Sequence, residues 1–127
     1  MKPIINDNGV YCPDQWEDEI KIGIDNYQKP HCSICIVKLD ENKWIGSTHF
    51  STATMKCGLL GGGSYPSNTD QRFLTKEECI RYHARELHET FTEQRLHSGW
   101  DGFDKIIDKL EDLGKLKTEL QLTLFEL

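Results

Sequence analysis

The stretch from Ser33 to Thr52 constrains the fold of this chain more than any other, because its two halves have the pattern of a β-hairpin. Ser33 to Leu39 is apolar and rich in β-branched residues, and Trp44 to Thr52 alternates as a second strand does. The polar residues between them, Asp40 to Lys43, have the length of a hairpin connection. We therefore expect an antiparallel β-hairpin over these residues.

Alternation also assigns side chains to faces, because successive residues of a strand point to opposite sides of a sheet. On the second strand one face carries Trp44, Gly46, Thr48 and Phe50, and the other carries Ile45, Ser47, His49 and Ser51. We expect Trp44 and Phe50 to point into the core.

A capping box marks the start of a long helix. Thr75 is placed as the N-cap and Glu78 stands at the third helical position, which is the spacing at which each side chain bonds the other's backbone N–H. An apolar stripe follows, and we expect the helix to end near Leu96. The stripe consists of Ile80, Ala84, Leu87 and Phe91.

Two further helices are predicted from apolar spacing. The first runs from Cys12 to Tyr27, where Trp16, Ile20 and Ile24 recur every four residues. The second begins near Asp101 and is expected to end at Gly114, since glycine commonly follows the last turn of a helix. Its apolar face comprises Phe103, Ile106, Ile107, Leu110 and Leu113.

Two segments are expected to lack helical structure. Gly58 to Asn68 is glycine-rich and is predicted to be an irregular loop. After Gly114, apolar residues fall on even positions, a two-residue period typical of extended chain. These are Leu116, Leu120, Leu122 and Leu124.

The predicted fold class is therefore α+β, a small antiparallel hairpin or sheet packed against two or three helices. At 127 residues the chain is long enough for one core. We expect a single domain over residues 1–114 and an extended tail over 115–127.

Composition narrows the classes of function. Apolar residues make up 37% of the chain and charged residues 28%, as in ordinary soluble proteins. No apolar run approaches the roughly 20 residues of a spanning helix, and the first residues lack a signal sequence, so no membrane association and a cytoplasmic location are expected. A net charge of −6 disfavours direct nucleic-acid binding.

The last residues carry the most specific motif. Gln121 to Phe125 is Gln-Leu-Thr-Leu-Phe, which resembles the pentapeptide, usually Gln-Leu-Ser/Asp-Leu-Phe, by which bacterial replication and repair proteins bind the DNA sliding clamp. Four of the five positions match, and Thr123 keeps the small hydroxyl of Ser. The resemblance implies that the Gln121 amide forms a hydrogen bond on the clamp, that Leu124 and Phe125 fill a hydrophobic pocket, and that Leu122 makes a lesser contact. The alternative is an edge strand paired with the chain's own sheet.

The body of the chain has a second, fainter resemblance. From Ile34 to Leu96, a Trp-bearing strand, a glycine-rich loop and a capped helix follow one another in an order similar to that of small uncharacterised proteins of phages and mobile elements. This resemblance implies no activity.

The five cysteines allow a metal hypothesis. With no export signal they are expected to be reduced, as Cys12, Cys32, Cys35, Cys57 and Cys79. A zinc site would use Cys32, Cys35, Cys79 and His83, since Cys79 and His83 stand one helical turn apart. Buried thiols are the favoured interpretation, because alternation puts Cys32 and Cys35 on opposite faces of a strand. No metal and no cofactor are therefore expected.

Catalytic motifs are lacking in the sequence. The glycine run is not followed by Gly-Lys-Ser/Thr, the His-Glu-x-x-His pattern is absent, and no nucleophile and base stand at a recognisable spacing. The leading hypothesis is a non-enzymatic accessory protein of a bacterium or mobile element that docks on a protein partner, the sliding clamp by resemblance. The alternatives are an acidic inhibitor or decoy of a host nuclease or defence protein, and a small zinc-binding protein.

Overall fold

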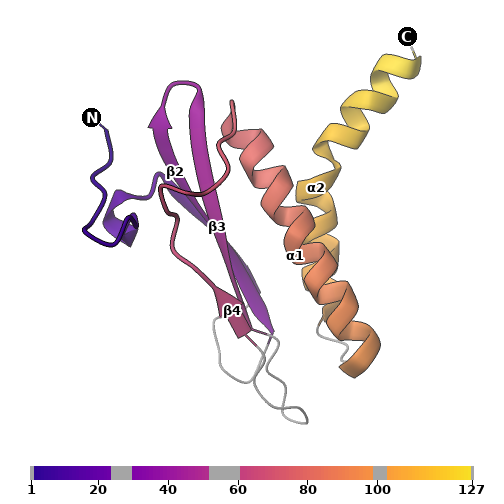
Figure 1. Cartoon of the computed structure of the whole chain (residues 1–127). Helices are drawn as coiled ribbons and strands as arrows, with labels where there is room; N and C mark the ends of the chain where they lie inside the picture. The colour runs from indigo at the N-terminus through magenta and orange to yellow at the C-terminus, as the bar shows by residue number, and fades with distance from the viewer. Residues whose placement is uncertain (1, 24–29, 52–60, 99–102, 127) are drawn as a thin grey trace.

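Two helices pack on one face of a four-stranded antiparallel sheet in the computed structural model of the chain (Figure 1). The structure describes residues 2–23, 30–51, 61–98 and 103–126, and for residues 61, 94–98 and 115–126 it describes the backbone alone. The predicted α+β class is confirmed. In chain order the elements are a short 3-10 helix Pro13–Gln15, β1 Asp18–Gly23, β2 His31–Asp40, β3 Lys43–Ser51, β4 Gly61–Gly63, α1 Lys76–Ser98 and α2 Phe103–Glu126.

The predicted hairpin is confirmed as β2 and β3, and it lies at the centre of the sheet. The strands pair from His31 opposite Ser51 to Asp40 opposite Lys43, across a two-residue turn. β1 pairs with the outer side of β2, and β4 with the outer side of β3, so the strand order is β1-β2-β3-β4. Trp44 and Phe50 pack against the main core, which confirms the predicted facing.

The main core fills the space between the sheet and the two helices. Phe91 of α1 contacts rings on both sides, with centroids 6.4 Å from Phe50 and 5.5 Å from Phe103. Burial of these apolar surfaces is the main force that holds helices on sheet. The buried members are Ile22, Cys32, Ile34, Ile36, Ala84, Leu87, Phe91, Phe103, Ile106, Ile107 and Leu110.

A smaller core covers part of the opposite face of the sheet. Val37 and Ile45 are buried there under Tyr11, with Trp16 packed at the side. The indole N–H of Trp16 donates to the carbonyl oxygen of Tyr11 at 2.9 Å, which anchors the N-terminal segment. This segment covers the end of the sheet near the hairpin turn, so the middle of that face carries polar side chains.

The predicted helix from Cys12 to Tyr27 is wrong. A single 3-10 turn is followed by β1, in which all six residues pair with β2. Ile20 and Ile22 alternate with charged neighbours, and tertiary pairing with a buried strand outweighs a weak helical spacing. Ile24 and Tyr27 lie outside the described residues.

The glycine-rich segment is more regular than predicted. Gly61 to Gly63 form β4, which pairs with His49 to Ser51. Glycine keeps its backbone donor and acceptor, so it completes a sheet edge although it contributes no side-chain packing. Residues 58–60 lie outside the described ranges.

The predicted N-cap at Thr75 is confirmed. The Glu78 N–H donates to Thr75 Oγ1 at 3.1 Å, and α1 begins at Lys76.

Neither α1 nor α2, over the residues described, has a stretch long and apolar enough to cross a membrane.

The prediction of an extended tail after Gly114 is wrong, because α2 continues without interruption to Glu126. Gly114 does not have the positive φ of a helix-ending glycine. Instead Arg85 of α1 lies against it: Arg85 Nη2 donates to the Gly114 carbonyl at 3.2 Å, and a Cβ at Gly114 would be 3.3 Å from Arg85 Cγ. The glycine therefore permits close helix packing. The alternative edge strand is also wrong, since the segment is helical.

Candidate functional site

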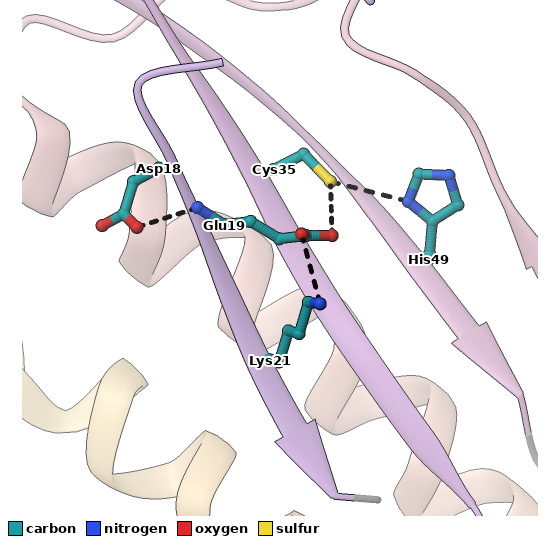
Figure 2. A network of polar contacts seen from close by, with 5 residues as sticks. All are labelled: Asp18, Glu19, Lys21, Cys35 and His49. Carbon is teal, nitrogen blue, oxygen red and sulfur yellow. Dashed lines mark hydrogen bonds and ion pairs between the residues drawn. The ribbon is translucent and has the colours of Figure 1, made fainter. Parts of the chain in front are cut away.

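A cluster of polar side chains lies on the sheet face opposite the helices. We call Glu19, Lys21, Cys35 and His49 the open-face cluster; they come from β1, β2 and β3 (Figure 2). Glu19 stands directly opposite Cys35 in the register, and His49 lies two residues along β3 from Ser47, the partner of Cys35. Antiparallel pairing thus brings together residues from three separate parts of the sequence.

The thiol of Cys35 is the centre of this cluster. Its Sγ lies 3.8 Å from Glu19 Oε2 and 3.6 Å from His49 Nδ1, and Lys21 Nζ lies 3.8 Å from the other oxygen of Glu19 (Figure 2). Cys35 is fully buried, whereas the Lys21 side chain remains 68% exposed. The cluster therefore has a buried centre and a solvated charged rim.

The electrostatics keep this thiol protonated. Burial, followed by the negative charge of Glu19, raises the pKa of Cys35 from 9.0 to about 12. A nucleophilic cysteine needs a lowered pKa and access to solvent, and Cys35 has neither. At neutral pH the thiol donates a weak hydrogen bond to the Glu19 carboxylate, and the His49 imidazole lies against the same sulfur atom.

Aromatic side chains and a small cleft border the cluster. Tyr65 lies with its ring centroid 5.7 Å from that of His49 and 5.5 Å from that of Trp16. The cluster also lines a cleft of about 300 Å³, a volume near the lower limit for small-molecule sites. The cleft is lined by Glu19, Lys21, Ile22, Gly23, His31, Cys32, Ser33 and His49.

A second group, Cys79 and His83, lies on the helix face of the sheet. Both side chains pack directly on the backbone of Gly46, where a Cβ would lie 2.8 Å from Cys79 Sγ and 2.8 Å from His83 Cδ2. His83 Nδ1 is 2.8 Å from Glu86 Oε1, while its Nε2 is buried without a partner among the described residues. Burial raises the pKa of the Cys79 thiol to about 12, so this thiol is also neutral.

The hypothetical zinc ligands are not brought together. Cys35 lies on the open face, and the sheet separates it from Cys32, Cys79 and His83. Cys32 pairs with Phe50, four residues along β3 from Gly46, which corresponds to about 13 Å. Within the described ranges no three His, Cys, Asp or Glu side chains are grouped so as to hold a metal ion. The zinc hypothesis on these four residues is therefore wrong.

The docking residues fall in the last turns of α2. Gln121, Leu122, Leu124 and Phe125 all lie within Phe103–Glu126, and the structure describes their backbone. Figure 1 shows this end of α2 diverging from α1 and extending away from the sheet. The segment and the open-face cluster lie on different parts of the molecule.

No protein-family model, curated protein or solved structure matches this chain.

Sequence reasoning missed the open-face cluster. Alternation correctly predicted that Cys32 and Cys35 lie on opposite faces of the sheet, and likewise His49 and Phe50. The faces of two cluster members, Cys35 and His49, could therefore be predicted from the sequence. The remaining two members, Glu19 and Lys21, lie in β1, and the helical spacing of residues 12–27 predicts a helix there instead of a strand. The alternating Asp18-Glu19-Ile20-Lys21-Ile22 was the signal that identifies β1.

Proposed function

We propose that this chain is a non-enzymatic accessory protein of a bacterium or mobile element that docks on a protein partner, the DNA sliding clamp, through Gln121, Leu122, Leu124 and Phe125. The observation that carries the proposal is the pentapeptide Gln121 to Phe125 at the far end of α2. The backbone of this end of α2 extends away from the sheet (Figure 1), which supports a role in binding a second molecule.

The energetics suit a weak peptide anchor. Burial of the Leu124 and Phe125 side chains in a partner's pocket contributes about 1.5 to 3 kcal/mol each, before the cost of ordering the peptide. Binding in an extended form requires the last turns of α2 to unwind. That cost is small, because terminal turns lack several backbone hydrogen bonds and both Thr123 and Phe125 have modest helix propensity.

The other groups support a binding role over a catalytic one. The three described buried thiols, Cys32, Cys35 and Cys79, all have their pKa raised to about 12 by burial, which suppresses nucleophilic chemistry.

The test is binding of the intact chain to purified clamp protein. We expect the double substitution Leu124→Ala and Phe125→Ala to weaken binding at least about tenfold, because each truncation removes more than the roughly 1.4 kcal/mol that a factor of ten represents. A matched control, Thr118→Ala with Glu119→Ala, changes the same helix outside the pentapeptide and should leave binding unchanged.

Two results would contradict the proposal: an intact chain that does not bind the clamp, or a double variant that binds as well as the original. The acidic-decoy alternative makes the opposite prediction. There, binding to a nuclease or defence protein depends strongly on salt and is indifferent to Phe125.

A further inference from the structure

The outer edge of β1 presents backbone groups that no strand among the described residues pairs. β1 is a terminal strand of the sheet, and its inner side pairs with β2 along all six residues. The Glu19 N–H donates to Asp18 Oδ1 at 2.8 Å, a side chain of its own strand (Figure 2). Since alternate residues of an antiparallel strand direct both backbone groups to the same side, Glu19 and Lys21 both direct theirs outward.

The charges on this edge are self-complementary. Glu19 and Lys21 flank Ile20, so an antiparallel copy of β1 centred on Ile20 places Glu19 opposite Lys21 of that copy, and Lys21 opposite its Glu19. Both are outward-directed residues, so in the same register each such pair exchanges two backbone hydrogen bonds. Side chains and backbone therefore favour one register.

The other outer strand of the sheet lacks these properties. β4 comprises three glycines, so it offers a short edge with no side chain to select a partner. β1 is twice as long, at six residues against three, and carries opposite charges at Glu19 and Lys21.

We propose that β1 is the interface through which two copies of this chain form a two-fold symmetric dimer with a continuous eight-stranded sheet. A two-fold axis perpendicular to the sheet at Ile20 keeps both helix layers on the same face and the Glu19–Lys21 pairs on the other. Pairing replaces the Asp18 contact of the Glu19 N–H by a carbonyl oxygen of the second copy. The occupant is a second copy because the charge pattern complements itself.

Charge reversal tests the register. We expect the full chain to show a concentration-dependent dimer in sedimentation, and Lys21→Glu to raise the dimer dissociation constant about tenfold, because two opposite-charge pairs become like-charge pairs. The double variant Glu19→Lys with Lys21→Glu is again self-complementary, and it should restore dimerisation. Lys43→Glu, the same charge change at an exposed position on β3, is the control and should have no effect.

Hydrogen exchange supplies a second measurement. The backbone amide of Lys21 should become protected as the protein concentration rises, and Lys21→Glu should abolish this protection. Three results would overturn the proposal: a monomer at millimolar concentration, a dimer indifferent to Lys21→Glu, or a double charge swap that fails to restore association. The first of these would leave the edge to a different partner, such as an extended peptide.

Discussion

Gly46 fixes the distance between α1 and the sheet, and its replacement by alanine tests that role. The added Cβ would lie 2.8 Å from Cys79 Sγ, 2.8 Å from His83 Cδ2 and 3.0 Å from His83 Nε2. Favourable contacts between such atoms lie near 3.5 to 4.0 Å, so α1 or its side chains must move by about 1 Å. Cys79 is fully buried and His83 is held by Glu86 at 2.8 Å, so neither side chain moves freely.

We expect Gly46→Ala to destabilise the protein by about 1 to 3 kcal/mol, the usual cost of overpacking a core. This outweighs the roughly 0.5–1 kcal/mol that alanine normally gains over glycine within a strand. Urea unfolding measures the change as a lower midpoint with an unaltered slope.

A double-mutant cycle identifies the cause. In a Cys79→Ala background one of the two clashing side chains is shortened, so the cost of Gly46→Ala should fall, giving a favourable coupling free energy. A stabilising Gly46→Ala, or a cost unchanged by Cys79→Ala, would refute the argument that α1 packs directly on this backbone.

Three further predictions concern the helix cap and two pH windows. Thr75→Ala should cost about 1 kcal/mol in urea unfolding because Glu78 loses its N-cap acceptor, whereas Thr75→Ser should cost little. Burial raises the pKa of Cys32, Cys35 and Cys79 from 9.0 to about 12, so the unfolded chain loses these protons at lower pH than the folded protein does. The stability that these thiols contribute should be fully present below pH 9 and should decline as the pH rises toward 12. Cys35→Ser should make the decline of the unfolding free energy with pH less steep. The Lys76 hydrogen bond lowers the pKa of Asp18 below 3.8, so its contribution is present above that pH and lost as pH falls through the lowered value; Lys76→Gln should flatten this acid limb in pH-dependent unfolding.

The central architecture followed from local rules that tertiary contacts reinforced. The β2–β3 hairpin and the start of α1 were predictable because alternation, turn composition and the Thr75 cap all agreed with the final packing. The packing of Trp44 and Phe50 against the core on the helix face followed from the same alternation.

The errors arose where a local pattern fitted two structures. Residues 16, 20 and 24 have helical spacing, while Ile20 and Ile22 also alternate as in a strand, and pairing with β2 decided between them. The pattern around Gly114 predicts a helix end, whereas its contact with Arg85, 29 positions away, cannot be read from the sequence. The open-face cluster needed the register of three strands, which no local pattern provides.

The proposed docking segment and the proposed dimer interface lie on different elements, and this separation allows their effects to be distinguished. A dimer joined at β1 carries two copies of Gln121 to Phe125 on the same face of its sheet. A ring-shaped partner with identical sites binds such a dimer more tightly than a monomer, because the second contact forms at high effective concentration. Lys21→Glu should therefore weaken binding to an immobilised intact ring. It should leave binding unchanged when the partner is a single clamp subunit, which has one site. Equal losses in both formats would mean that Lys21 acts on the docking segment itself, and no loss in either would show that the chain binds as a monomer.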